Sequence, residues 1–223
     1  MALQATGVKA HEEMECYRVK LDRIFQKFIS ILTFKMDPLA KAKALFHWLW
    51  RERPSRYEPH GRYKISKVID AQLDPGSPGV GNCLGLTLLY NCLLDKLGLR
   101  AKAVYLQIAF DLRPHVFSLI ERENSFIDVE NIFPTGFDYA GHRDNPSRIL
   151  WGDQELVSDI YLCQGNECFE KGQWDDALQN YNLSIKMNPH YEKAFLNRAI
   201  VLDRIAMEIT EKGGELGEKD KDR

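Results

Sequence analysis

The segment from Cys83 to Leu97 is apolar on nearly every side, and this feature most constrains the fold. A helix with that composition should be buried rather than lie on the surface. Asn82 is a suitable N-cap and Gly98 is a suitable C-cap, so the sequence predicts a helix between them. The rest of the chain then has to cover this helix.

Helices are also predicted upstream of this segment. Apolar residues recur at three- and four-residue steps from Glu12 to Leu32, which predicts an amphipathic helix. Asp37 and Pro38 are typical of a helix start, and this second helix should stop before Pro54. The chain then reads mostly as loop around a short segment at Ile65–Leu73.

The pattern changes after the apolar helix. Strands are expected at Ala101–Phe110, Val116–Ile120 and Phe126–Val129, with a hairpin turn at Glu121–Asn124. Residues 134–153 are rich in Gly, Pro, Asp and Asn, which favours loop and linker, and helical periodicity returns from Gln154. We predict an α+β domain over residues 1–150, an α-helical segment over 154–210, and a charged, disordered tail over 211–223.

Composition excludes several classes of protein. The 223 residues carry a formal net charge of -2, which gives no reason to expect a nucleic acid or a membrane as partner. No apolar run is long enough to span a bilayer, and the N-terminus has no signal-peptide pattern. Five scattered cysteines, without paired zinc-ligand spacing, favour a reducing, cytoplasmic location with no metal and no cofactor.

Cys83 is the candidate nucleophile. A helix N-terminus places N–H groups and a positive dipole end beside a thiol, which favours the thiolate and can also hold an oxyanion. A thiol nucleophile further needs an imidazole and a group that orients the imidazole. His115 opens a predicted strand and Asp128 lies in the next strand, so the sequence predicts a catalytic triad of Cys83, His115 and Asp128.

The acid of this triad depends on the register of the hairpin. A turn centred at Glu121 and Arg122 would set His115 and Asp128 across from each other on one face. A turn one or two residues later would separate them, and Glu130 is then the alternative acid.

These residues resemble the transglutaminase-like superfamily, which has a papain-like fold. The resemblance covers roughly residues 35 to 137 and rests on Gly81-Asn82-Cys83, on the turn Leu97-Gly98-Leu99-Arg100-Ala101, and on the segments that begin at His115 and end at Asp128. It implies an amide hydrolase or an acyl transferase that acts on a protein or peptide without a cofactor. Val116 and Phe117 replace the Ala-Trp often seen after the histidine in that family.

The C-terminal segment resembles a tetratricopeptide repeat (TPR). Residues 158–191 span 34 positions and contain Gly165, Ala177 and Pro189 at matching places. Gly165 and Ala177 should let two helices approach, and a second repeat contributes only its first helix, to about Ile209. Asn166 and Asn197 fall where peptide-binding repeats often place asparagines, while helix packing is the simpler role.

Two further functions stay open beside the enzyme hypothesis. One is a non-catalytic interaction module that keeps the fold and recruits a protein partner through the repeat segment. The other is a disulfide-forming oxidoreductase, which is disfavoured because no second cysteine lies near Cys83 in the sequence.

Overall fold

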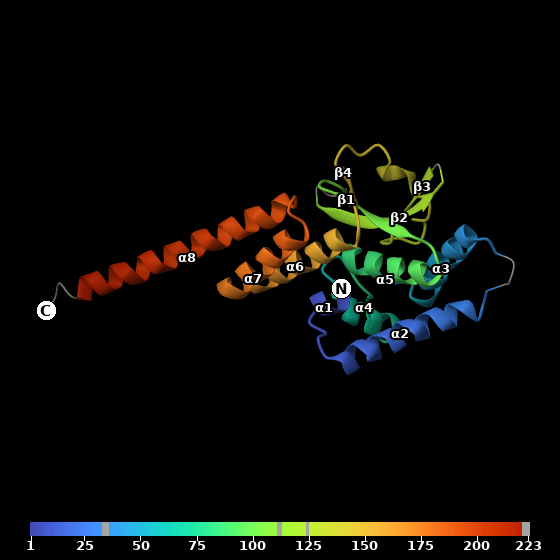
Figure 1. Cartoon of the computed structure of the whole chain (residues 1–223), viewed down its shortest axis with the longest axis horizontal. Helices are drawn as coiled ribbons and strands as arrows, with labels where there is room; N and C mark the ends of the chain where they lie inside the picture. Colours follow the sequence, from blue (N-terminus) through green and yellow to red (C-terminus); the bar gives the residue numbers. More distant parts are fainter. Residues whose placement is uncertain (33–35, 111–112, 124, 220–223) are drawn as a thin grey trace. The chain divides into compact units, whose positions relative to one another are not determined.

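The computed structural model describes residues 1–32, 36–110, 113–123 and 125–219, with residues 212–219 described through their backbone alone. The chain divides into two compact units, Met1–Leu156 and Val157 onward. The helices of Figure 1 are α1 (Ala2–Ala5), α2 (His11–Ile29), α3 (Pro38–Glu52), α4 (Ile65–Leu73), α5 (Cys83–Lys96), α6 (Asp153–Glu170), α7 (Trp174–Met187) and α8 (Glu192–Lys219). The strands are β1 (Ala101–Leu106), β2 (His115–Arg122), β3 (Ser125–Val129) and β4 (Arg148–Trp151).

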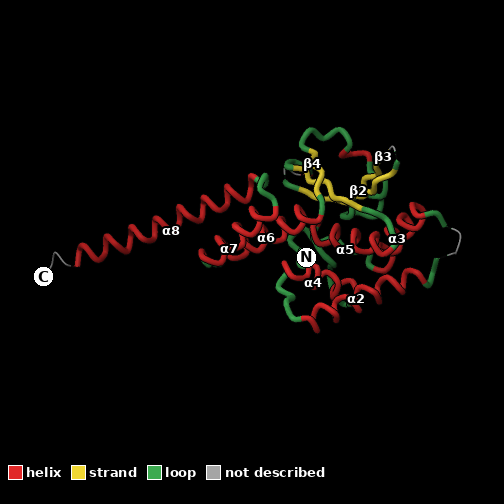
Figure 2. The backbone as a smooth tube through the Cα atoms, in the orientation of Figure 1, coloured by secondary structure: helices red, strands yellow, loops and turns green. Residues whose placement is uncertain are grey.

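The first unit is a four-stranded sheet with helices packed on it (Figure 2). The strand order is β3-β2-β1-β4, and all three pairings are antiparallel. Helix α5 packs against β1 and β2, while α4 and α2 pack against α5. The first unit is therefore a mixed helical and antiparallel-sheet domain, which agrees with the predicted α+β class.

Helix α5 is the buried centre that its composition predicts. Its apolar side chains are covered all round, and Leu86, Leu89 and Tyr90 have no exposed surface. The Tyr90 hydroxyl donates a hydrogen bond of 2.9 Å to the carbonyl oxygen of Ala42 in α3, and the Tyr90 and Phe46 rings meet edge-on. These contacts fix α3 against α5 and satisfy the one polar group that Tyr90 buries.

The opposite face of the sheet holds a second, smaller core. Val104 and Leu106 of β1 pack with Phe117 and Leu119 of β2 in one buried cluster. The ring of His142 stacks on Phe117 with centroids 5.3 Å apart, so the segment between β3 and β4 covers this face. Both faces of the sheet are therefore buried around β2.

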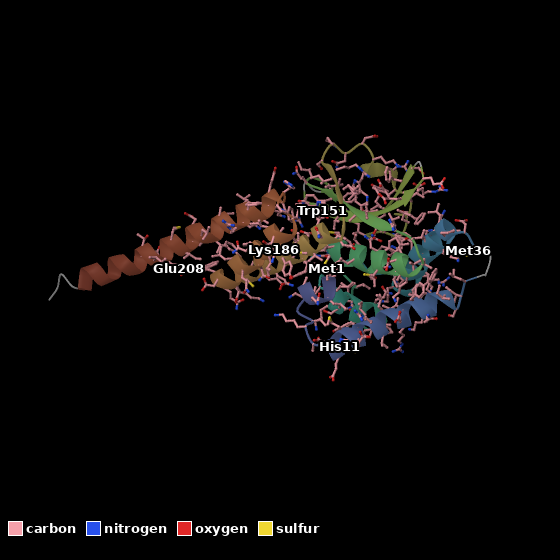
Figure 3. The ribbon with its side chains drawn as sticks, viewed as in Figure 1. Met1, His11, Met36, Trp151, Lys186 and Glu208 are labelled. Atoms are coloured by element: carbon pink, nitrogen blue, oxygen red, sulfur yellow. The ribbon has the colours of Figure 1, made fainter. Side chains whose placement is uncertain are left out.

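Two predictions of local structure are wrong. Residues 134–153 were expected to be loop and linker, but Arg148–Trp151 forms β4 and pairs with β1. The Trp151 ring stacks on Tyr105 of β1 with centroids 4.1 Å apart, and this contact stabilises the pairing of β4 with β1 (Trp151 is labelled in Figure 3). The tail 211–223 was expected to be disordered, but α8 continues to Lys219, through a stretch with no proline to stop it. Residues 220–223 lie outside the described part.

The second unit is a helical hairpin followed by α8. A β-carbon on Gly165 would overlap the Tyr181 ring, and Ala177 is fully buried, so small residues bring α6 and α7 together as predicted. Helix α8 packs on α7 and buries Ala194 and Val201. No helix in the described part of the chain is both long and apolar enough to cross a bilayer.

The start of α5 is built around two glycines. A β-carbon on Gly81 or Gly85 would overlap the carbonyl oxygen of Arg62, which accepts a hydrogen bond from the backbone N–H of Asn82 at 3.1 Å. This close backbone approach sets the position from which α5, and with it Cys83, begins.

We predict that Gly85→Ala destabilises the protein. Alanine in a helix is ordinarily about 1 kcal/mol more favourable than glycine, but here the new methyl group meets backbone and the Val68 side chain. The overlap should reverse the sign and lower the free energy of unfolding by about 1–3 kcal/mol in urea denaturation. Gly76→Ala is the matched control, because its β-carbon would make only an ordinary contact. A Gly85→Ala protein more stable than the wild type would contradict the prediction.

Candidate active site

Cys83 is the first residue of α5, as predicted. Asn82 caps the helix, since its side-chain oxygen accepts a hydrogen bond of 3.0 Å from the backbone N–H of Gly85. The Cys83 side chain is partly exposed, and none of the five cysteines, all of which the structure describes, is in a disulfide. Cys92, in the middle of the same helix, differs, because burial raises the pKa of its thiol to about 11. Cys83 thus differs from Cys92 in lying at the helix N-terminus.

His115 lies between the Cys83 thiol and a carboxylate. Its Nε2 atom is 2.7 Å from Oε2 of Glu130, and the Cys83 side chain is close enough to raise the pKa of the ring. Because Nε2 is engaged by Glu130, Nδ1 is the ring nitrogen available to the thiol. His115 is buried, with 6% of its surface exposed, so solvent does not compete strongly for either contact.

The ring of His115 holds its proton strongly. Burial alone would lower the pKa of His115, but hydrogen bonds with Cys83 and Glu130 and the charge of Glu130 outweigh it and raise the pKa to about 10. The partner carboxylate shifts the other way. Burial would raise the pKa of Glu130, but the hydrogen bond and charge of His115, together with the nearby imidazole of His142, outweigh burial and lower it. The imidazolium–carboxylate pair is thus the favoured state at neutral pH.

The carboxylate at His115 belongs to Glu130 and not to Asp128, so the predicted acid is wrong. Arg122 pairs with Ser125, which puts the turn later than Glu121 and Arg122 and sets Asp128 opposite Leu119. This is the register in which Glu130 was the alternative acid.

Asp128 has a different partner. Its two carboxylate oxygens accept hydrogen bonds from Arg148 of β4 at 2.7 and 3.0 Å, and Arg148 also donates to the carbonyl oxygen of His142 at 3.0 Å. The backbone N–H of Tyr139 donates to the carbonyl oxygen of Asp128. Asp128 therefore ties β3 to β4 and to the segment that carries His142.

The chain around Glu130 is held from several sides. The side-chain amide of Asn131 donates to the hydroxyl oxygens of Ser118 in β2 and Thr87 in α5, at 2.9 and 3.3 Å. The Glu130 backbone N–H donates to the carbonyl oxygen of Gly136, where a β-carbon would overlap the Glu130 backbone. These contacts place the carboxylate relative to both the sheet and α5.

Three site residues were not identified from the sequence. His142 places Nε2 3.3 Å from Oε2 of Glu130, so a single carboxylate oxygen faces two imidazoles. The Phe110 ring, 38% exposed, lies edge-on to His115 and His142, with centroids 5.4 and 4.7 Å away. Tyr57 bridges to Gly81, and burial together with the charges of Cys83 and Glu130 raises its pKa. No spacing signal marks these residues, because none of the three lies in an α-helix or in a strand of the sheet.

Among the described residues, His115, Glu130 and His142 form a buried group that could hold a metal ion, with ligand atoms all within 4.8 Å of one another. Two imidazoles and a carboxylate are ligands that zinc and iron accept. The 2.7 Å contact between His115 and Glu130 is a hydrogen-bond distance, however, so a metal would have to displace the proton that this pair shares. The triad contact and a metal ion are alternative uses of the same atoms.

The structure predicts how His115 titrates. The pKa of His115, measured by NMR of its ring protons or carbons, should be about 10. Replacing Cys83 by alanine removes one of the groups that raise this pKa, so the pKa of His115 should fall in Cys83→Ala. A wild-type pKa near 6.5, the value for an isolated histidine, would contradict the geometry.

The same contact predicts how stability depends on pH. A histidine whose pKa is raised by folding stabilises the folded state fully below about 6.5, and this contribution is lost as the pH rises towards 10. His115→Gln should lower the free energy of unfolding by about 2 kcal/mol near pH 6. The difference from the wild type should shrink as the pH approaches 10 in denaturant titrations. If the difference in the free energy of unfolding between the wild type and His115→Gln instead grew with pH, the His115–Glu130 pair would be contradicted.

Comparison with known proteins identifies the C-terminal repeat. A family model described as TPR repeat matches residues 165–204, which run from α6 through α7 into α8. No curated protein and no solved structure matches the chain. The chain therefore contains a TPR repeat.

Proposed function

We propose that the first unit is a cysteine-dependent amide hydrolase or acyl transferase with a papain-like, transglutaminase-like core. Cys83 is the nucleophile, His115 transfers the proton, and Glu130 orients the imidazole. One observation carries this proposal: the buried ring of His115 contacts a thiol at a helix N-terminus and, through Nε2, a buried carboxylate. This is the arrangement that thiol nucleophiles need.

The proposed reaction starts from the protonated ring. A cation beside a thiol favours the thiolate, which adds to the carbonyl carbon of the substrate. The carbonyl oxygen takes the negative charge and faces the N–H groups at the start of α5. His115 then gives its proton to the leaving amine, and the C–N bond breaks to leave a thioester on Cys83.

The second half of the reaction uses the same groups. The neutral ring accepts a proton from water, or from an acceptor amine, as that nucleophile attacks the thioester and releases the Cys83 thiolate. Hydrolysis is the simpler outcome, because no feature of the sequence marks an amine-acceptor site. We propose a peptide or protein as the substrate, with the exposed part of Phe110 bordering the position it would occupy.

A second candidate is a protein-interaction module without catalysis. The TPR repeat at residues 165–204 supports it, because such repeats serve protein–protein contacts. The predicted peptide-holding asparagines are engaged internally, since Oδ1 of Asn166 accepts hydrogen bonds from Tyr181 and Asn197 at 2.9 and 2.8 Å. That pairing favours helix packing over peptide binding at these two positions.

Thiol labelling tests the enzyme proposal. An ordinary thiol with a pKa near 8.5 is only a few per cent thiolate at neutral pH, so Cys83 should react with iodoacetamide about tenfold faster than exposed Cys16. Glu130→Gln should reduce the Cys83 rate to near that of Cys16. Asp128→Asn should leave the rate largely unchanged while lowering the melting temperature. Peptide mass spectrometry separates the five sites.

The labelling rates distinguish the thiol mechanism from the non-catalytic interaction module. Equal rates for Cys83 and Cys16 would overturn the thiol mechanism, and a loss of rate in Asp128→Asn but not in Glu130→Gln would reassign the acid. A fast Cys83 that cleaves no amide in a peptide library, and forms no thioester with peptide esters, would favour the interaction module.

A further inference from the structure

His142 has a buried nitrogen atom without a hydrogen-bond partner. Its Nε2 atom lies 3.3 Å from Oε2 of Glu130, yet it makes no hydrogen bond with any described residue. Only 4% of His142 is exposed, and this atom is shielded from solvent. A buried polar atom without a partner costs free energy, and a bound ion is one of the few physical reasons for such an atom.

The His142 ring is held in this position by its surroundings. It stacks on Phe117 with centroids 5.3 Å apart, and the rings of Phe110 and Tyr139 meet it edge-on with centroids at 4.7 and 5.0 Å. Arg148 donates a hydrogen bond to the carbonyl oxygen of His142, which fixes the backbone as well. Packing therefore keeps Nε2 beside the carboxylate, although the two groups form no hydrogen bond.

The buried group of His115, Glu130 and His142 is a ligand set that suits zinc. Each side chain offers one ligand atom, and these atoms lie within 4.8 Å of one another. Two imidazoles and one carboxylate are the protein ligands of a common class of zinc site, which keeps its fourth position open. Mg²⁺ and Ca²⁺ prefer oxygen ligands, so the two nitrogens disfavour these ions.

The distances at Oε2 of Glu130 are close to those of a zinc site. Zinc bonds of about 2.0–2.2 Å put neighbouring ligand atoms of a tetrahedron about 3.3–3.6 Å apart. The 3.3 Å between His142 and Glu130 already has this value. The 2.7 Å between His115 and Glu130 has to lengthen by about 0.6 Å once their shared proton has gone. Only one of the two contacts therefore has to change for zinc to bind.

We propose that His115, Glu130 and His142 bind one Zn²⁺ ion, and that this ion withdraws His115 from Cys83. Zinc replaces the proton on Nε2 of His115, and that proton is released to solvent. Three coordination bonds form, and no group is oxidised or reduced. The other ring proton then stays on Nδ1, the nitrogen available to the thiol, because a metal-bound imidazole with one N–H is a far weaker acid than an imidazolium.

A zinc-bound His115 can neither take a proton from the thiol nor give one to a leaving amine. Zinc and the proton thus compete for one nitrogen, and the site serves Cys83 only while the proton holds it. The effect on Cys83 rests on the proposed function, whereas the binding of zinc does not.

Calorimetric titration with zinc tests the binding. The full chain with Cys83→Ala, treated first with a chelator, should bind one ion without any contribution from that thiol. Adding His142→Gln should weaken binding by at least about a hundredfold, because even the outer-shell partners of zinc ligands are worth about 10–100-fold in affinity. His60→Gln is the matched control, since His60 is exposed in a turn between α3 and α4. Circular dichroism confirms that each variant is folded.

Cobalt(II) in place of zinc identifies the ligands. Imidazole and carboxylate ligands give visible absorption alone, whereas a thiolate ligand adds an intense charge-transfer band in the near ultraviolet. A chain that binds no zinc, a loss of binding in His60→Gln equal to that in His142→Gln, or a thiolate band would each overturn the site.

Thiol labelling tests the effect on Cys83. Zinc should slow the reaction of wild-type Cys83 with iodoacetamide to near the rate of Cys16, and His142→Gln should remove this protection. Zinc that binds but leaves a fast Cys83 unchanged would overturn the withdrawal of His115. A Cys83 that is already slow without zinc would contradict the proposed function, while the calorimetry would still decide the zinc site.

Discussion

The site of the first unit depends on one buried carboxylate. Glu130 has no exposed surface, and a carboxylate without partners at such a place is costly. His115 and His142 both face its Oε2 atom, while Oε1 accepts a hydrogen bond of 3.3 Å from the backbone N–H of Ile132. One buried carboxylate oxygen thus faces two imidazoles, one on β2 and one in the segment that covers Phe117.

The sequence predicted helix starts well where the determining contacts lie within one turn of the chain. The Asp37 cap and the helix that begins at Cys83 were predicted, because caps and periodicity act within one turn of the chain. Ile65–Leu73 was expected only as a short segment among loops, and it is helix α4. The acid was not predicted, because Asp128 and Glu130 lie on the same side of one chain and only the turn decides which approaches His115. Moving along β3 by two residues keeps the side chain on the same face of the sheet but changes which carboxylate lies at His115.

The remaining errors have a similar cause. The strand Arg148–Trp151 is short, and its stability comes from Tyr105, far away in sequence, so its own composition did not reveal it. In the repeat unit, Asn166 and Asn197 matched positions that bind peptides elsewhere, yet Asn197 and Tyr181 both donate hydrogen bonds to Asn166 within the unit. Position in a motif does not specify which neighbour a polar side chain will find.

The chain order of the site has a consequence for biosynthesis. Cys83 leaves the ribosome before His115 and Glu130, and Arg148, which ties β4 to Asp128, emerges last. Domains fold as units once their chain is complete. The nascent protein therefore carries Cys83 without the completed His115–Glu130 pair and its covering segment until the last strand of the sheet has been synthesised. A truncated chain that ends before β4 would lack the Asp128–Arg148 contact, so the surroundings of Cys83 are assembled only in the finished domain.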